Sequence, residues 1–357
     1  MNILYFSPVS WNWIRQRPHF TVEYLSKAGH KVEFFFVGPF GRCHLISKKV
    51  GTLLIRERPV LPCSLKFPLI EWVNRYISRT FLLHEHYDTV ILTNPRQLDF
   101  LPEKIRKRTP IVYDCMDIIP AFYPPGRIRD YLIAKERELC QLAIFLIASS
   151  NFIRQYLQKI VPDKDIAVVR NASAPFFAES VRKATPADLP PGTLLYLGTI
   201  DQWLDWKLLT SFAKKHPDKT ICLVGVSHIK RKFLPNNILI LPPIPHSQVP
   251  SYLAAANILL IPFASSPLIE GVDPVKLYEY MATGKPILSF YWKELDYFCG
   301  YPNLFFYKSP EEFELAIERI EENGCRQIVD STFQKSNSWA QRMELYSGLL
   351  EQIRKNN

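Results

Sequence analysis

The feature that most constrains the fold of this chain is an alternation of short apolar runs with amphipathic stretches of helical length. In the first half, the apolar runs expected to be buried strands are residues 2–6, 31–37, 89–93, 111–114, 143–148 and 167–169. In the second half they are residues 193–197, 220–224, 238–241, 258–261 and 286–289. Helical spacing between them occurs at residues 17–28, 128–142, 151–159, 206–215, 248–255 and 274–282. Strand–helix–strand units place successive strands in parallel, so the sequence predicts an α/β protein with two parallel sheets.

One stretch interrupts this alternation. Residues 179–192 contain three prolines and a glycine and show no apolar periodicity, which is typical of a linker. A chain of 357 residues is long enough for two domains. We therefore expect domains at residues 1–180 and 193–335, followed by an amphipathic helix at 338–355. The apolar face of that helix is Trp339, Met343, Tyr346 and Leu350.

Composition favours a folded, soluble protein. Hydrophobic residues make up 47% of the chain and charged residues 22%. Apolar runs such as residues 254–263 are shorter than the roughly 20 residues that span a bilayer. The first ten residues lack the basic region of a signal peptide, and we expect a cytoplasmic location. The seven cysteines form no CxxC pair, which fits a reducing compartment and predicts no metal site.

Positive charge is concentrated in the first half. Residues 1–180 contain 25 Lys and Arg against 16 Asp and Glu, a surplus of nine positive charges. Residues 181–357 contain 19 Lys and Arg against 18 Asp and Glu, a surplus of one. A basic face attracts anionic membrane, phosphorylated ligands or nucleic acid. No nucleic-acid recognition motif accompanies the charge, and we expect no nucleic-acid partner. The cluster Lys104, Arg106, Lys107 and Arg108 is either a contact with anionic lipid or an ordinary solvated face. The surplus favours peripheral attachment to the inner face of the plasma membrane.

The segment 270–289, EGVDPVKLYEYMATGKPILS, combines a polar loop, a short helix ended by Gly284 and a strand. A helix N-terminus in such a sheet presents N–H groups to a phosphate, and Lys276 in the first turn adds a full charge. Glu279, three residues on, shares its face and can accept two hydrogen bonds from a ribose. An exposed Lys–Glu pair on an ordinary amphipathic helix is the alternative interpretation of these residues alone.

The run PVKLYEYMATGKPI, residues 274–287, resembles the donor-binding helix of the GT-B glycosyltransferases, and of family 4 in particular. In that family two glutamates stand eight residues apart, and the second binds the ribose of a nucleotide sugar. Glu279 matches the second glutamate. Gly271 stands in place of the first, with Glu270 one residue out of register and Asp273 nearby.

Other segments resemble the same family more diffusely, over nearly the whole chain. Residues 196–199, Tyr-Leu-Gly-Thr, resemble the first strand and glycine turn of its donor domain. The family often follows this turn with an Arg and a Lys that grip the pyrophosphate. Here Thr199 and Asp205 stand roughly in those places, so Lys276 is expected to contribute more of the binding to the pyrophosphate. The donor-binding residues implied by the resemblance are Gly198, Thr199, Asp273, Lys276, Leu277 and Glu279.

The resemblance implies the GT-B architecture, in which two Rossmann-like domains face each other across a cleft. Residues 1–180 would bind the acceptor and residues 193–335 the nucleotide-sugar donor. Trp339 and Arg342 resemble the family's final helix, which crosses back onto the first domain.

The loop at residues 7–20 is the expected acceptor site. Aromatic faces stack on sugars and arginines clasp phosphates, and Trp11, Arg15 and Arg17 are the expected acceptor-binding residues. The alternative is that the tryptophan covers the sheet edge and that His19 is a packed or solvated histidine.

The catalytic residues are expected near the end of the strand at 111–114, because ligands gather at strand ends in open α/β sheets. Asp117 is the first candidate, together with His19, and Asp114 is the second. Either aspartate could instead be a helix cap or turn residue. Many relatives carry a histidine near Met116, and this chain does not.

The resemblance implies a glycosyltransferase of the hexosyltransferase type. It would move a sugar from a nucleotide-sugar substrate to a saccharide or lipid-linked acceptor in surface polysaccharide or glycoconjugate synthesis. Retention of anomeric configuration and no metal or other cofactor are expected. The alternatives are a GT-B-like sugar-nucleotide epimerase and a non-catalytic protein that binds a nucleotide sugar or another anionic ligand. A nicotinamide-dependent oxidoreductase is disfavoured, because no glycine occurs among residues 7–10.

Overall fold

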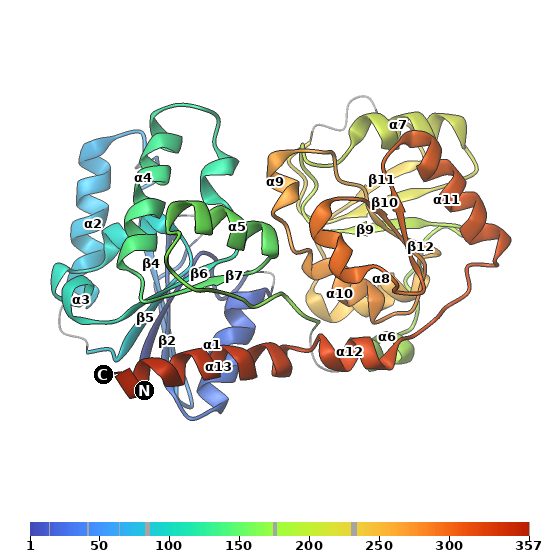
Figure 1. Cartoon of the computed structure of the whole chain (residues 1–357). Helices are drawn as coiled ribbons and strands as arrows, with labels where there is room; N and C mark the ends of the chain where they lie inside the picture. The colour runs from blue at the N-terminus through green and yellow to red at the C-terminus, as the bar shows by residue number, and fades with distance from the viewer. Residues whose placement is uncertain are drawn as a thin grey trace. The chain divides into compact units, whose positions relative to one another are not determined.

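The computed structural model describes residues 1–13, 15–40, 43–63, 65–82, 86–173, 177–229 and 234–356. The chain divides into two compact units (Figure 1). The first unit comprises residues 1–170 and 342–357, and the second comprises residues 171–341. Each is built on one parallel or nearly parallel sheet with helices on both faces, which confirms the predicted α/β class with Rossmann-like domains.

The first unit contains an eight-stranded sheet in the order β3-β4-β2-β1-β5-β6-β7-β8. Its pairs are parallel except for the antiparallel pair of β3 and β4. The strands are β1 (Asn2–Ser7), β2 (Lys31–Pro39), β3 (Ile46–Val50), β4 (Leu53–Val60), β5 (Thr89–Leu92), β6 (Ile111–Cys115), β7 (Phe145–Ala148) and β8 (Ile166–Val168). The helices are α1 (Arg17–Lys27), α2 (Pro68–Leu82), η1 (Pro95–Phe100), α3 (Glu103–Arg108), η2 (Ile119–Phe122), α4 (Arg127–Leu142), α5 (Asn151–Ile160) and most of α13 (Trp339–Asn356).

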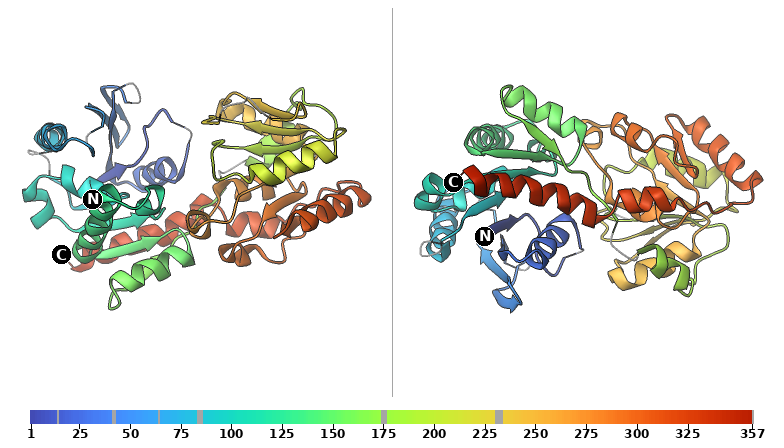
Figure 2. Two further views of the ribbon diagram at one scale, coloured as in Figure 1. Left: turned by 90° about the horizontal axis from the view of Figure 1, so that it is seen from above. Right: turned by 60° about the horizontal axis from the view of Figure 1, so that its bottom comes forward.

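The alternation of side chains along β6 shows how the two faces of this sheet are covered. Tyr113 points to one face, where its hydroxyl donates to Glu136 of α4 at 2.8 Å. Asp114 points to the other face, where it meets Arg17 of α1 and Tyr346 of α13. Helices α1 and α13 therefore share one face and α4 covers the opposite one (Figures 1 and 2).

The guanidinium of Arg17 is the polar centre of the α1 face. It is buried and forms an ion pair with Asp114 at 2.8 Å. It also donates to the backbone carbonyls of Val169 and Arg170, just after β8. The hydroxyl of Tyr346 donates to the same carboxylate at 3.3 Å. One buried ion pair thus joins α1, β6, the chain after β8 and α13.

The second unit contains a six-stranded parallel sheet in the order β11-β10-β9-β12-β13-β14. The strands are β9 (Leu194–Leu197), β10 (Ile221–Val224), β11 (Ile238–Leu241), β12 (Ile258–Ile261), β13 (Ile287–Phe290) and β14 (Leu304–Tyr307). The helices are α6 (Phe177–Lys183), α7 (Trp206–Lys215), η3 (His246–Gln248), α8 (Val249–Ala255), α9 (Pro267–Glu270), α10 (Val275–Met281), η4 (Lys293–Phe298), α11 (Pro310–Glu322) and α12 (Ser331–Ser336).

Helices α7 and α11 pack together on one face of this sheet. The ring of Phe212 meets that of Phe313 edge-on at 5.2 Å, and Lys215 pairs with Glu314. Helices α8 and α10 lie on the other face (Figure 1). There the hydroxyl of Tyr280 accepts from the backbone N–H of Leu197 at 2.9 Å, so α10 is attached directly to β9.

The stretch predicted as a linker is partly helical. Its first residues belong to α6, in which Phe177 and Val181 bury one face and Lys183 pairs with Glu179 at 2.5 Å. Phe177 lies just before the stretch, so the periodicity is not visible within 179–192 alone. Residues 171–192 all belong to the second unit, and the division between the units falls at Arg170 and Asn171.

The sequence prediction also missed three strands and two long helices, α2 and α11. Strand β3 is almost wholly exposed, and the adjoining β4 alternates buried and half-exposed residues, so neither forms a continuous apolar run. Strand β14 is only four residues long. Helix α2 was missed although it spans fifteen residues. The apolar face predicted for the last helix is confirmed, because Trp339, Met343, Tyr346 and Leu350 are buried in α13. Of the helices that the structure describes, none has both the length and the apolar character needed to cross a bilayer.

We predict that Asp114→Asn destabilises the protein by about 3–5 kcal/mol, because it leaves the buried Arg17 guanidinium without a counter-charge. Chemical denaturation followed by circular dichroism measures this change. The control is Asp130→Asn on α4, where the side chain is exposed and the change should stay within about 0.5 kcal/mol. A decrease in the free energy of unfolding below about 1 kcal/mol for Asp114→Asn would show that the Arg17–Asp114 ion pair does not hold these four segments together.

Candidate functional site

The strand order of the second unit identifies where a ligand would bind. Strand β9 lies between β10 and β12. From β9 the chain adds β10 and β11 on one side of the sheet, and then returns to add β12, β13 and β14 on the other side. Ligands in open α/β sheets bind at such a switch point, beyond the carboxyl ends of the strands. Gly198 follows β9 and Gly225 follows β10 at this edge.

These two glycines allow the backbone to pass unusually close to itself. Gly198 has φ +153° and Gly225 has φ +150°, conformations that side chains disfavour. A Cβ atom on Gly225 would lie 2.0 Å from the carbonyl oxygen of Gly198. A Cβ atom on Gly198 would lie 2.1 Å from Cε of Lys276 and 2.6 Å from its Nζ. The missing side chain at Gly198 is therefore what makes room for Lys276.

Lys276 lies in the first turn of α10, with its Nζ atom against Gly198 and 5.6 Å from the ring centroid of Tyr196. Burial lowers the pKa of this amine, and the nearby Glu279 opposes that shift. Across the part of the chain that the structure describes, no hydrogen bond or ion pair reaches the Nζ atom. An ammonium in this environment favours an anionic ligand, because such a ligand would compensate its lost hydration.

Glu279 lies one turn further along α10 and is half-buried. Its Oε1 atom is 3.5 Å from Nε2 of His246, which belongs to η3. The His246 ring also lies 6.1 Å from the ring of Phe177. Sequence reasoning missed His246, because it precedes Glu279 by 33 residues and no local motif marks it. Its position makes it a residue that orients the Glu279 carboxylate.

Two of the predicted donor-binding residues are engaged within the protein. The carboxylate of Asp273 is buried and accepts from the backbone N–H of Asn171 at 2.6 Å and from the Tyr278 hydroxyl at 3.0 Å. Leu277 is buried in the core of the unit. Both side chains therefore hold α10 in place within the unit. The backbone carbonyl of Thr199 accepts from the Tyr196 hydroxyl at 3.1 Å, which holds the turn after Gly198.

A second polar pair stands just beyond the two glycines. Asp201 and His228 form an ion-pair contact at 2.6 Å, and both side chains are partly exposed. The bridge between Ile200 and Ser227 brings their loops together. Sequence reasoning missed this pair as well, because its members come from loops that follow different strands.

In the first unit, His19 lies in the first turn of α1, and its ring contacts the backbone of the loop that follows β1. The side chain is buried, and its Nδ1 atom accepts from the backbone N–H of Gln16 at 3.1 Å. Its Nε2 atom lies 3.2 Å from the carbonyl oxygens of both Ser10 and Trp11. Burial, followed by the charge of Arg15, lowers the pKa of the imidazole. Both ring nitrogens are occupied, so the predicted catalytic role of His19 has no free nitrogen to act through.

The three predicted acceptor-binding residues differ in their environments. Trp11 is half-buried, with its ring edge-on to Phe34 at 5.1 Å. Arg15 is half-exposed and pairs with Glu23 at 2.5 Å. Arg17 is buried in its ion pair with Asp114, so its guanidinium supports the fold. Trp11 and Arg15 therefore remain the accessible candidates in this loop.

The two aspartates after β6 also differ. Asp114, the second catalytic candidate, is buried and paired with Arg17. Asp117, the first candidate, is half-buried, and no hydrogen bond or ion pair reaches its carboxylate from the described residues. The loss of water around this carboxylate raises its pKa to about 7. Asp117 is thus a carboxyl group without a counter-charge that titrates near neutral pH.

The described ranges contain no group of three or more His, Cys, Asp or Glu side chains placed to hold a metal ion.

Comparison with known proteins places these features in context. No protein-family model matches the chain. The chain is 27% identical over 200 residues to a Bacillus subtilis (strain 168) protein provisionally assigned as the teichuronic acid biosynthesis glycosyltransferase TuaH. This match covers 50% of the chain and 49% of that relative, so it spans about half the length of each.

Solved structures match along the whole chain. Sucrose-phosphate synthase from Thermosynechococcus elongatus has a TM-score of 0.77 at 14% identity, with both chains covered completely. The UDP-forming α,α-trehalose-phosphate synthase from Burkholderia vietnamiensis has a TM-score of 0.70 at 9% identity and 99% coverage of both chains. The lipopolysaccharide outer core galactosyltransferase WaaB has a TM-score of 0.63 at 13% identity, also with 99% coverage of both. The chain therefore has the GT-B glycosyltransferase fold.

Proposed function

We propose that this chain is a glycosyltransferase of the hexosyltransferase type that uses a nucleotide-sugar donor. The acceptor is a saccharide or lipid-linked saccharide, and the product belongs to surface polysaccharide or another glycoconjugate. The observation that carries the proposal is the Lys276 ammonium against Gly198, with the Glu279 carboxylate one turn further along the same helix. The GT-B fold and the partial match to a glycosyltransferase relative support it.

The donor side of the proposed reaction uses the edge of the second unit's sheet. The diphosphate binds at the turn after β9, where Gly198 lets it approach the backbone and Lys276 supplies a positive charge. Glu279, oriented by His246, accepts hydrogen bonds from the ribose hydroxyls. As the glycosidic bond breaks, the leaving nucleotide diphosphate gains negative charge. Lys276 stabilises this charge in the transition state, and we propose that the reaction needs no metal.

The acceptor side uses the first unit. Asp117 is our candidate for the group that exchanges a proton with the acceptor hydroxyl. A carboxyl group with a pKa of about 7 is present in both protonation states at neutral pH, which suits general acid–base chemistry. Trp11 and Arg15 are the candidates for stacking on the acceptor sugar and binding an acceptor phosphate. Retention of anomeric configuration is part of the proposal by analogy with the family that the sequence resembles.

We place this reaction at the inner face of the plasma membrane. The surplus of nine positive charges in residues 1–180 supports attraction to an anionic surface. Within the basic cluster of α3, Lys104, Lys107 and Arg108 are exposed, whereas Arg106 is directed to Glu138 at 3.2 Å. Lys107 pairs with Glu103 at 2.5 Å, so Lys104 and Arg108 are the exposed cations of α3 proposed to contact lipid headgroups.

We predict that Lys276→Met and Glu279→Gln each weaken donor binding by about 10- to 100-fold, because each removes a charge-assisted hydrogen bond to the donor. Thermal shift with UDP-, GDP-, TDP- and ADP-linked sugars identifies the donor, and titration gives its affinity. Lys207→Met and Glu318→Gln change exposed residues of α7 and α11 and serve as matched controls. Affinities within twofold of wild type for both site variants would refute the assignment.

A Gly198→Ala variant tests the same site through the backbone. The added Cβ would lie 2.1 Å from Cε of Lys276, so the lysine must move away from the turn. We expect donor affinity to fall as far as in Lys276→Met, by about 10- to 100-fold. Gly192→Ala is the control, because it also replaces a positive-φ glycine but meets no atom within 4 Å. Unchanged donor affinity in Gly198→Ala would show that the lysine position is not required.

Asp117→Asn should change how stability depends on pH. The folded-state pKa of about 7 exceeds the ordinary value of 3.8, so ionisation of Asp117 costs stability as pH rises between these values. The melting temperature of the variant relative to wild type should therefore increase from pH 4 to pH 7 and level off above. Thermal melts across this range measure the difference, and Asp163→Asn at an exposed position is the control. A pH-independent difference would contradict the raised pKa.

The same variant should slow sugar transfer about 100-fold or more.

A further inference from the structure

Helix α2 (Pro68–Leu82) is the most unusual surface element of the first unit, because its polarity is reversed. On a surface helix, apolar residues normally face the core and polar residues face water. In α2 the buried positions include Glu71, Asn74 and Ser78. The exposed positions include Leu69, Trp72 and Tyr76, with 73%, 64% and 62% of their surfaces accessible. Helical spacing places these three exposed residues on one face.

The exposed apolar face extends beyond these three residues. The rings of Trp72 and Tyr76 stack at 6.0 Å with an interplanar angle of 17°. Ile77 is exposed further along the helix, and Phe67 is exposed just before it. Phe81 lies nearer the buried side of the helix, and the Arg58 guanidinium lies over its ring at 4.2 Å. We call Phe67, Leu69, Trp72, Tyr76 and Ile77 the α2 apolar face. Contiguous exposed apolar side chains of this kind mark interaction sites on folded proteins.

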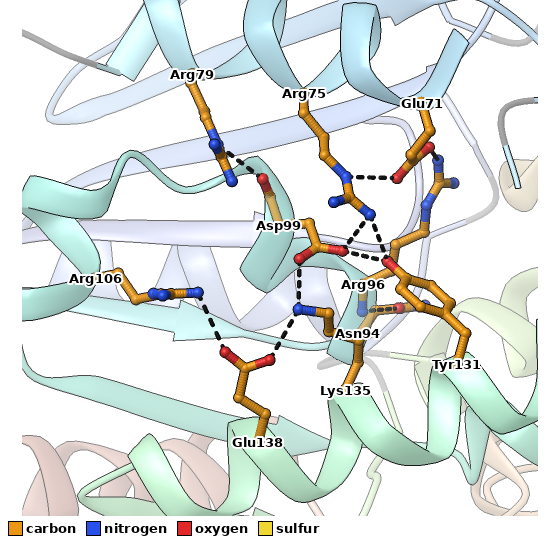
Figure 3. A network of polar contacts seen from close by, with 10 residues as sticks. All are labelled: Glu71, Arg75, Arg79, Asn94, Arg96, Asp99, Arg106, Tyr131, Lys135 and Glu138. Atoms are coloured by element: carbon orange, nitrogen blue, oxygen red, sulfur yellow. Dashed lines mark hydrogen bonds and ion pairs between the residues drawn. The ribbon is translucent and has the colours of Figure 1, made fainter. Parts of the chain in front are cut away.

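The buried polar contacts fix the helix in this orientation (Figure 3). Glu71 accepts from Arg75 at 3.1 Å and from Arg96 at 2.7 Å. The buried carboxylate of Asp99, in η1, pairs with Arg75 at 2.8 Å and with Lys135 of α4 at 2.7 Å. Turning α2 about its axis to bury its aromatic side chains would break the two pairs that join it to η1, Arg75 with Asp99 and Glu71 with Arg96. The reversed polarity is therefore built into the packing of α2 against η1 and α4.

A further contact reinforces this orientation. The Asn74 side chain is buried and makes two hydrogen bonds of 2.9 Å with the backbone of Leu61, one as donor and one as acceptor. Removing Asn74 from this place would leave the backbone groups of Leu61 without these partners. The apolar face is thus turned outward by polar contacts along the buried side of the helix.

The charges around the α2 apolar face identify its partner. Arg79 of α2 donates to the backbone carbonyl of Asp99, and the chain runs from there into α3, where Lys104, Lys107 and Arg108 are exposed. Lys66 is exposed at the other end of the helix. An apolar face that contains Trp and Tyr and is flanked by cations is suited to the interface of an anionic bilayer. A uniformly apolar protein partner would not require these flanking charges.

We propose that the α2 apolar face docks the protein onto anionic lipid bilayers, with Trp72 and Tyr76 entering the headgroup region and the cations of α3 contacting lipid phosphates. This inference rests on the proposed membrane-side location of the reaction and names the surface responsible for it. It does not depend on donor chemistry, because vesicle binding can be measured without donor or acceptor. The two proposals can therefore fail separately.

The test is co-sedimentation of the full chain with vesicles of phosphatidylcholine alone and of phosphatidylcholine mixed with phosphatidylglycerol. We expect binding to the mixed vesicles, and a loss of roughly tenfold or more in the double variant Trp72→Gln/Tyr76→Gln. Lys104→Glu/Arg108→Glu should remove the preference for phosphatidylglycerol. Leu315→Gln, an exposed apolar position on α11 of the second unit, is the matched control and should bind like wild type. Equal melting temperatures would show that the variants are folded.

A depth measurement adds a second readout. Lipids brominated in the acyl chain should quench tryptophan fluorescence of the bound protein, and Trp72→Phe should lose most of this quenching while it still binds. Three results would overturn the proposal: no binding to either vesicle, binding unchanged in the double variant, or a wild-type dimer in analytical ultracentrifugation that the double variant abolishes. The last result would assign the α2 apolar face to a second copy of the chain.

Discussion

The guanidinium of Arg17 is buried in the first unit, and it remains compatible with the interior because every side of it meets a negative or partly negative group. Asp114 supplies the counter-charge, and the carbonyls of Val169 and Arg170 accept hydrogen bonds from the Nη1 atom of Arg17. Tyr346 adds a hydrogen bond to the carboxylate. Four segments far apart in the sequence depend on this one interaction. Helix α13, at the end of the chain, belongs to the unit formed by the beginning of the chain through the Tyr346 hydrogen bond and through the buried side chains of Met343, Leu350 and Ile353.

The second unit depends on a different constraint, the absence of side chains at Gly198 and Gly225. The carbonyl of Gly198 occupies the place where a Cβ atom of residue 225 would lie. The side chain of Lys276 occupies the place where a Cβ atom of residue 198 would lie. This arrangement places the Lys276 ammonium at the carboxyl edge of the sheet, where no described residue forms an ion pair with it and Glu279 lies one turn further along the helix. Glu279 and His246 complete the polar surroundings. This geometry supports the proposal that an anionic ligand binds at this edge, and the proposed sugar transfer rests on that binding together with the fold.

The comparison of the predicted and observed sites shows where sequence reasoning was sufficient and where it was not. Lys276 and Glu279 belong to one short helix, so their relative positions follow from helix geometry and could be predicted. His246 and the pair of Asp201 and His228 come from separate loops and could not. Arg17 was predicted to bind the acceptor and His19 to act in catalysis, because polar residues in a loop resemble a functional site. In the structure both are buried by contacts with segments that a local pattern does not reveal.

The sequence alone determined the α/β class, most strands, the order of the two Rossmann-like units and the donor-helix motif. These features are encoded by local periodicity and by residues close together in the chain. The tertiary structure decided which polar side chains are buried in ion pairs and which are accessible to a ligand. It also decided the orientation of α2, whose residues have an amphipathic period but whose polar side faces inward. The reason is physical: periodicity specifies that a helix has two faces, but which face is buried depends on contacts that the fold brings together. In α2 these are Arg75 with Asp99, Glu71 with Arg96 and Asn74 with Leu61.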